Sequence, residues 1–297
     1  MGPDEVDIGV RLVRQLIDRQ FPRWAALPVA QVRSAGTDNA IFRLGSGMAV
    51  RLPRRREAAA EAARQHEWLP RLARLLPLAV PVPLARGAAG DGFPFPWLIC
   101  RWLPGENVAD QPDVDLYDAA GRLGRFVAAL HRIDATGAPP SFRGGPPRVL
   151  DARVRRELRD LAADGTVDPE LAATAWQTAL AAPAWARAPV WVHADLYPVN
   201  LLARHGQLTA VIDFGGLGAG DPAIDMLPAW AWLTAQTRDL FRAQTQADDA
   251  TWARGRGWAL GLGIGAACYY RDTNPTLAAI GQHAIAEVLT DHQRTTT

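Results

Sequence analysis

Apolar residues in the first third of the chain switch from a helical period to short extended runs. Residues 4–20 carry an apolar stripe at helical spacing, which predicts an amphipathic helix. Three short apolar runs follow, with small and polar residues between them, and they predict three strands joined by two turns. These runs are Val29 to Val32, Ala40 to Leu44 and Met48 to Leu52.

The next segments add a helix and further strands. Residues 57–76 repeat Ala and Leu at helical spacing, so we expect a helix there. The prolines at positions 81 and 83 end this helix and lead into a strand. Residues 95–103 form an apolar run typical of a buried strand, which ends at Pro104-Gly105. The N-terminal part is therefore predicted to be strands with one helix beside them.

From residue 116 onward the pattern is mainly helical. Helices are predicted over residues 116–133, 149–163, 169–182 and, after an interruption, through most of 226–297. Short extended runs supply the interruption, at Val190 to Val192, Leu201 to Ala203 and Leu208 to Ile212. The last helical part is rich in Trp, which we interpret mainly as core packing, with one or two rings available for a pocket.

Composition narrows the classes of function. The 297 residues, 48% apolar, suffice for a sizeable core. All 32 basic residues are Arg, against 31 acidic residues, and a net charge of +1 gives no reason to expect a nucleic-acid partner. Two cysteines cannot form a disulfide framework, which favours the cytoplasm. Neither a signal peptide nor a membrane-spanning run is recognisable, so we expect a soluble protein with no membrane partner.

Chemistry-bearing residues gather between positions 190 and 225. A predicted strand delivers His193, Asp195 and Asn200 into a loop, and the hairpin that follows ends on Asp213-Phe214-Gly215. Either motif alone is weak evidence, but the two in this order, with a strand between them, match the needs of metal-assisted phosphoryl transfer. One carboxylate orients the attacking hydroxyl, while an amide oxygen and a second carboxylate hold Mg²⁺.

On these motifs the chain resembles the aminoglycoside phosphotransferase-like family of the protein-kinase superfold, from about Ser34 to Trp232. The resemblance implies an α+β, two-lobed protein-kinase-like fold. Its N-lobe, residues 1–101, would be an antiparallel sheet plus a helix, and its C-lobe, residues 102–297, would be mostly helical. It also implies ATP (or GTP) and Mg²⁺ as cofactors.

Roles at the site follow from the same resemblance. Asp195 is expected to be the catalytic residue, with Asn200 and Asp213 as the metal ligands. We expect His193 to brace the loop, and Asp221 and Asp225 to be structural, although Asp225 has the alternative of facing substrate. Three positions depart from the family pattern: Ala194 and Val199 stand where Gly is common, and Tyr197 where His is common.

The nucleotide is expected to bind mainly through the N-terminal part. Arg51 stands where kinases place a Lys that clamps the phosphates, and Glu67, preferred over Glu61, is the expected tether. The turn with Ser34, Gly36 and Thr37 is in place to cover the phosphates, its alternative being an ordinary hairpin turn. The backbone from Arg101 to Leu103 is expected to bond adenine. We list this cofactor-binding set as Arg51, Glu67, Ser34, Gly36, Thr37, Arg101 and Leu103.

The acceptor is the open question. We expect a hydroxylated small molecule, an antibiotic of the aminoglycoside or macrolide kind. Eight acidic residues against six Arg from Asp221 to Thr297 do not choose between a polycation and an apolar acceptor. A metabolic kinase for a sugar or amino alcohol is one alternative, and a nucleotide-binding pseudokinase is another. A protein kinase is less favoured because only a few residues separate Gly215 from Gly220, which leaves no room for an activation segment. The sequence does not indicate an oligomeric state.

Overall fold

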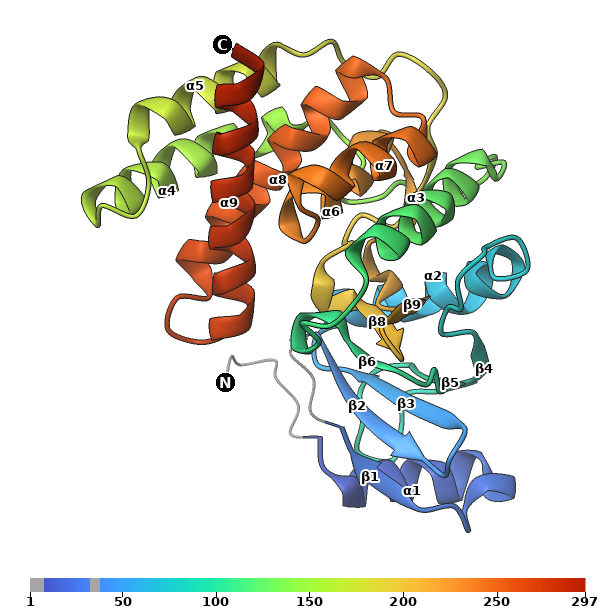
Figure 1. Cartoon of the computed structure of the whole chain (residues 1–297). Coiled ribbons are helices and arrows are strands. Elements are labelled where there is room, and N and C mark those ends of the chain that lie inside the picture. Colours follow the sequence, from blue (N-terminus) through green and yellow to red (C-terminus); the bar gives the residue numbers. More distant parts are fainter. Residues whose placement is uncertain (1–7, 33–37, 297) are drawn as a thin grey trace. The chain divides into compact units, whose positions relative to one another are not determined.

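The computed structural model describes residues 8–32 and 38–296 and divides into two compact units (Figure 1). Unit 1 comprises Met1–Gly105 together with Ala210–Gly215, and unit 2 comprises Glu106–Thr209 and Gly216–Thr297. The chain thus leaves unit 1 at Gly105, four residues beyond the boundary expected from the sequence. It returns for one short segment that holds Asp213.

Unit 1 is built on a five-stranded antiparallel sheet in the order β1-β2-β3-β5-β4. Between β2 and β3 Gly45 takes the left-handed conformation (φ 59°), in the second of the two turns predicted from the sequence. The strands are β1 (Val29–Gln31), β2 (Asn39–Leu44), β3 (Met48–Pro53), β4 (Pro83–Gly87) and β5 (Trp97–Arg101).

A different helix covers each face of this sheet. The main core of unit 1 contains buried residues of α1 (Val10–Gln20) together with Val50 and Ile99 of the sheet. On the opposite face Ala62 of α2 (Arg56–Leu72) packs with Leu98 and Cys100. Because successive side chains of a strand point to opposite faces, Arg51 follows Val50 onto the α2 side. The pleat of β3 thereby places a buried guanidinium beneath α2.

Two helix bounds differ from the expectation. The second helix ends at Leu72 rather than at residue 76, because the chain turns at residues 73–75, and Pro77 also disfavours helical backbone for residue 76. The first helix begins at Val10, and the expected residues 4–7 lie outside the part of the chain that the structure describes.

Unit 2 is mainly helical and is centred on α8 (Asp249–Tyr269). Every residue of α8 from Arg254 to Gly265 is buried, because helices pack around it on several sides. In the described part of the chain, no helix combines the length and apolarity that a membrane span needs. The other helices are α3 (Leu116–Arg132), α4 (Asp151–Ala163), α5 (Pro169–Ala181), α6 (Pro228–Ala231), α7 (Ala235–Thr245) and α9 (Pro275–Thr296).

Small residues set how closely α8 and α9 approach. A Cβ added at Gly281 would come within 2.6 Å of the Gly263 carbonyl oxygen and 2.8 Å of the Ala267 backbone nitrogen. Such separations are shorter than any real Cβ contact, so the two backbones pack at a distance that only glycine permits at this point. Gly263 and Gly281 therefore allow α8 and α9 to pack closely against each other.

Short strands of unit 2 position the loops that carry chemistry. β7 (Val190–Val192) pairs with β10 (Gly218–Gly220), and β6 (Glu106–Asn107), β8 (Leu201–Arg204) and β9 (Gln207–Val211) form a three-stranded sheet. The end of β7 leads directly into the segment from His193 to Asn200. The chain passes from unit 2 to unit 1 within β9.

Candidate active site

The loop after β7 is fixed by one buried carboxylate. Asp225, with no exposed surface, accepts hydrogen bonds from the backbone nitrogens of His193 (3.0 Å) and Ala194 (2.8 Å). His131 Nε2 lies 3.0 Å from the same carboxylate. These bonds hold Ala194 in the left-handed region at φ 67°, which explains why Gly is common there in the family. Asp225 is therefore placed to support the loop rather than to meet a substrate.

His193 and Gly216 complete this support. The imidazole of His193 is fully buried, and its Nδ1 accepts a hydrogen bond from the backbone nitrogen of Asp195 (3.2 Å). A Cβ at Gly216 would come within 2.7 Å of the His193 carbonyl oxygen, so the segment after the Asp-Phe-Gly motif packs directly against the loop. The histidine thus bonds its own loop backbone and is withdrawn from solvent.

Asp195 stands at the tip of the loop with both carboxylate oxygens engaged. Asn200 Nδ2 donates to Asp195 Oδ2 (2.9 Å) and to the Asp195 carbonyl oxygen (2.8 Å). Arg143 Nη1 donates to Asp195 Oδ1 and to the carbonyl oxygen of Ala194 (3.0 Å). The Asp195 side chain keeps 29% of its surface exposed, so it is oriented by protein groups and still accessible.

Arg143 was not singled out by the sequence analysis. It lies in the Pro- and Gly-rich loop at 136–147, between the helices predicted over 116–133 and 149–163. That loop runs beside β10, with hydrogen bonds from Ser141 N to Ala219 O (3.0 Å) and from Ala219 N to Pro139 O (2.8 Å). Because β10 pairs with β7, these bonds bring the loop alongside the segment that carries Asp195. One Arg among 32 carries no local signal that would predict this.

Electrostatics tie Arg143 to its neighbours. Burial alone would lower the pKa of Arg143, but the charge of Asp195 and then Tyr197 outweigh burial and raise it. Burial likewise raises the pKa of the Tyr197 phenol, with Asp195 and Tyr270 acting in the same direction. Arg143 is therefore a permanent cation beside Asp195, and Tyr197 is a neutral phenol.

Asp221 has a structural environment of its own. Its carboxylate accepts a hydrogen bond from Ala223 N (3.0 Å) and forms a forked, buried ion pair with Arg254. The two distances of the fork are 2.7 Å from Nε to Oδ2 and 2.9 Å from Nη2 to Oδ1. The pair links the segment after the Asp-Phe-Gly motif to the central helix α8.

Within unit 1, Arg51 meets the Asp-Phe-Gly carboxylate. Its Nη2 lies 3.0 Å from Asp213 Oδ1, and its Nη1 donates to Gln65 Oε1 (2.8 Å). Asp213 has φ 59°, which is unusual for a residue other than Gly, and its side chain is 34% exposed. A hydrogen bond from Val211 N to Ala79 O (3.0 Å) holds Val211, the last residue of β9, in unit 1.

The expected tether, Glu67, requires a correction. It is exposed, and the structure places Gln65 against Arg51 instead. Residues 65 and 67 lie about 200° apart around a helix, so both cannot face the sheet. Gln65 shares the buried face with Ala62 and Leu69. The sequence analysis missed it because only acidic partners for Arg51 were considered.

Glu61, the acidic residue passed over in favour of Glu67, lies one turn before Gln65 on the buried side of α2. Burial raises its pKa to about 7, and the charges of Asp38 and Asp213 contribute in the same direction. A Cβ at Gly215 would come within 2.6 Å of Glu61 Oε2 and 3.7 Å of Asp213 Oδ1. The carboxyl groups of Glu61 and Asp213 thus both lie beside Gly215.

The remaining expected nucleotide contacts are placed only in part. The backbone nitrogens of Arg101 and Trp102 donate to Val82 O (2.9 Å) and Gly47 O (2.8 Å), so both are already used within unit 1. Leu103 follows them and is buried. Ser34, Gly36 and Thr37 lie outside the described residues.

Solved structures share this architecture. The GDP and kanamycin complex of APH(2'')-IIIa matches with a TM-score of 0.68 and 19% identity, over 95% of this chain and 98% of that one. The macrolide 2'-phosphotransferase MphH from Brachybacterium faecium matches with a TM-score of 0.59 and 24% identity, over 88% and 91%. A macrolide 2'-phosphotransferase type I matches with a TM-score of 0.61 and 18% identity, over 93% of this chain and 97% of that one. These likenesses confirm the α+β, protein-kinase-like fold class.

No curated protein matches the chain in a comparison of sequences. The model of the phosphotransferase enzyme family, APH, matches residues 29–258 and so includes the Asp195 loop, the Asp-Phe-Gly motif and Arg51. Because this match covers most of the chain, the protein belongs to the APH phosphotransferase enzyme family, as the resemblance in its motifs predicted.

Proposed function

We propose that the protein transfers the γ-phosphoryl group of ATP, or of GTP, to a hydroxyl group of a small molecule. The observation that carries the proposal is the partly exposed Asp195 carboxylate, oriented by Asn200 and Arg143 in a loop that Asp225 fixes. Family membership supports the reaction type. GDP and ADP appear in the names of solved complexes with the same fold, which supports a nucleotide donor.

In the proposed step, the acceptor oxygen forms a bond to the γ-phosphorus. The bond from that phosphorus to the β,γ-bridging oxygen breaks, and the nucleoside diphosphate leaves with the electron pair. The hydroxyl proton passes to Asp195, which orients the hydroxyl before the transfer. Because such transition states are loose, positioning contributes more than proton abstraction, and a carboxylate held by two donors suits that role.

The donor set fits Mg²⁺, which supplies charge neutralisation on the phosphates when bound. Asn200 uses its Nδ2 toward Asp195, so its amide oxygen remains the end suited to a hard cation. Asp213 provides a partly exposed carboxylate. Arg51 pairs with Asp213, and we propose that Arg51 exchanges this carboxylate for the nucleotide phosphates when nucleotide binds. Asn200 and Asp213 are then the metal ligands, and Leu103 contacts the base.

We propose an antibiotic acceptor of the aminoglycoside or macrolide kind, since relatives of the same fold are named for both classes. A sugar or amino-alcohol kinase remains the alternative enzyme. We place the reaction in the cytoplasm, where nucleotide is abundant and the two cysteines, which are unpaired, stay reduced.

A screen for ATP and GTP consumption over antibiotics, sugars and amino alcohols tests the proposal. Asp195→Ala is the control, and its kcat on the best acceptor should be lower by on the order of 10²-fold or more. Nucleotide affinity should be retained, because Asp195 is assigned to the acceptor. Nucleotide binding without turnover of any acceptor would replace the enzyme by a pseudokinase, and an unchanged kcat in Asp195→Ala would overturn the role of this residue.

A further inference from the structure

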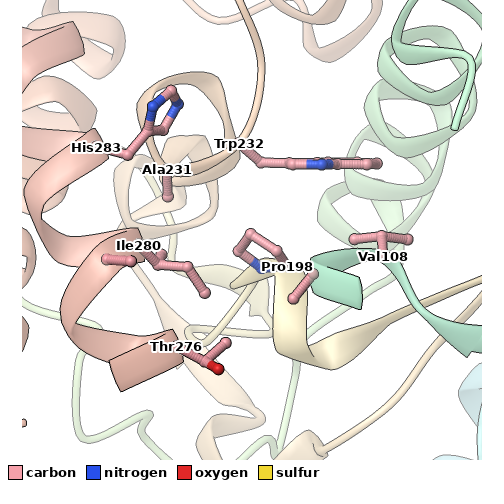
Figure 2. A pocket seen from close by; sticks show the side chains of 9 residues that line it. Val108, Pro198, Ala231, Trp232, Thr276, Ile280 and His283 are labelled. Atoms are coloured by element: carbon pink, nitrogen blue, oxygen red, sulfur yellow. The ribbon is translucent and has the colours of Figure 1, made fainter. Parts of the chain in front are cut away.

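Unit 2 contains a pocket of about 480 Å³ that begins at the catalytic loop. Pro198, three residues after Asp195, forms one wall, and Val108 and Trp232 line it beside Pro198 (Figure 2). This volume is in the range of sites for small molecules. Since Asp195 is proposed to orient the acceptor hydroxyl, a pocket built on the same loop is the natural place for the rest of the acceptor.

The opposite wall is one face of α9. Thr276, Ala279, Ile280 and His283 line the pocket at the helical spacing i, i+3, i+4, i+7. Figure 2 shows Ile280 of this face pointing toward Pro198. Thr276, Ala279 and His283 are exposed although the helix packs on α8 with its other side. This face therefore offers an apolar surface to a ligand, with one hydroxyl and one imidazole as its polar groups.

Carboxylates are missing from this surface. Among the described residues, those that line the pocket include no Asp or Glu. Polycations such as aminoglycosides need several carboxylates, each placed to face an ammonium group, because desolvating an unpaired charge is costly. An aromatic ring, a proline and an isoleucine instead match a broad apolar face on the ligand.

The acidic residues of the C-terminal region are mostly committed elsewhere. Of the eight between positions 221 and 296, six face an arginine or a histidine, and the remaining two, Asp239 and Asp272, are exposed and do not line the pocket. The six pairs are Asp221–Arg254, Asp225–His131, Asp248–Arg187, Asp249–Arg242, Glu287–Arg238, and Asp291 with both Arg238 and Arg256.

Asp195 itself already has a cationic partner. Arg143 is fixed against it by backbone contacts of its own loop, and its pKa is raised, so its charge persists at any working pH. An ammonium group that approached Asp195 would meet this guanidinium and would gain less than it would from an unpaired carboxylate.

We infer that this pocket binds the phosphoryl acceptor, and that the acceptor is a hydroxylated molecule with a broad apolar face and at most one positive charge, not a polycation. The inference rests on the proposed function for the identity of the acceptor. Of the two antibiotic classes expected from the sequence, it favours the macrolide kind, whose apolar face a surface without carboxylates can desolvate.

Direct binding tests the inference without turnover. Erythromycin, which has one amine and an apolar ring, and kanamycin, a polycation, are titrated calorimetrically into the full-length protein in 0.15 M salt. We expect erythromycin to bind at least about tenfold more tightly, a difference of about 1.4 kcal/mol. Equal or tighter binding of kanamycin, or binding of neither probe, would overturn the inference.

Two variants of α9 locate the site. Ile280→Glu places a carboxylate in the pocket, and Gln282→Glu places one on the same helix at an exposed position outside it. Ile280→Glu should weaken erythromycin binding by about tenfold or more and should strengthen kanamycin binding. Gln282→Glu should leave the affinity for each probe within about twofold of that of the parent protein. Equal effects of the two substitutions would refute the pocket.

Phosphorylation assays on the same proteins separate the two proposals. If erythromycin binds in the pocket but no nucleotide is consumed, the proposed function fails and the pocket assignment stands. If the KM for kanamycin is lower than that for erythromycin, and if Ile280→Glu leaves the KM for kanamycin unchanged, the proposed function stands and the pocket assignment fails.

Discussion

At the scale of single residues, the two oxygens of Asp195 have different partners with different consequences. Asn200 belongs to the same loop, so its bond fixes the local turn. Arg143 arrives from a loop 52 residues earlier, and it carries charge as well as geometry. We therefore assign Arg143 as a positioning residue that holds the carboxylate toward the acceptor.

Substitution of Arg143 should affect the chemical step more than nucleotide binding. A charge-assisted hydrogen bond contributes about 1.5–3 kcal/mol, so Arg143→Ala should lower kcat by about tenfold or more. KM for the nucleotide should change little. Arg143→Lys should recover part of the loss, since it keeps the charge but loses the planar guanidinium that donates to both Asp195 and the Ala194 carbonyl oxygen. Steady-state kinetics measure both constants. Loss of activity in both variants together with a lowered melting temperature would show a merely structural role.

Arg51 is expected to act on the phosphates and to depend on Gln65. Arg51→Ala should weaken ATP binding by about tenfold or more, because a charge-assisted pair is lost, while adenosine binds as before. Gln65→Ala should give a weaker version of this loss, since it frees the guanidinium.

Glu67→Ala is the matched control for Gln65→Ala, because Glu67 is exposed on the same helix. It should leave the affinities for ATP and for adenosine unchanged. Calorimetric titration of ATP and adenosine decides among the variants. A loss on Glu67→Ala with none on Gln65→Ala would contradict the observed contact and restore the tether expected from the sequence.

At the scale of elements, the close approach of α8 and α9 is a packing constraint that can be measured. Gly281→Ala should destabilise the protein by about 1–3 kcal/mol, because the added methyl group meets backbone atoms that cannot move independently. Gly121→Ala in α3 is the control. There a Cβ finds its nearest neighbour, Arg125 Nη1, at 3.5 Å, so the helix should gain up to about 1 kcal/mol. Urea unfolding of both variants gives the comparison, and equal changes would contradict the assigned packing.

Most elements were predictable because their patterns are local. The alternating runs and the polar turns give the first strands of unit 1 to within one or two residues, and α3 ends one residue before its expected limit. The errors lie at ends, where a proline or a turn overrides periodicity, as at Leu72 and at Asp151 after a short turn from Pro147. Contacts such as Arg143 with Asp195 escape such analysis, because the tertiary fold alone brings the two loops together.

At the scale of the whole molecule, the division into units could be predicted only in part. A boundary near residue 101 follows from the strand that ends at Pro104-Gly105, and the observed boundary lies after Gly105. The return of Ala210–Gly215 to unit 1 has no signal in the sequence, because it depends on the bond from Val211 to Ala79 and on the pair of Arg51 with Asp213. The motifs predict candidate site residues, whereas the partners of these residues are set by the fold.

Of the two proposed metal ligands, Asn200 supplies an amide oxygen and Asp213 a carboxylate. Asp213→Asn removes the only charge of this pair and should raise the Mg²⁺ concentration needed for half-maximal activity by about tenfold or more. Activity titrated against Mg²⁺ at saturating nucleotide provides the measurement. Superimposable curves for the variant and the parent would exclude Asp213 as a ligand.

Arg51 occupies a position where kinases use lysine, and the whole chain contains no lysine. The protein therefore offers no side-chain amine, at the proposed nucleotide site or elsewhere, to reagents that acylate amines. Nucleotide acyl-phosphate probes, which detect kinases by marking that lysine, would bind here without leaving a mark. A proteome survey based on such labelling would pass over this enzyme, and covalent inhibitors aimed at the same amine would find no atom to modify.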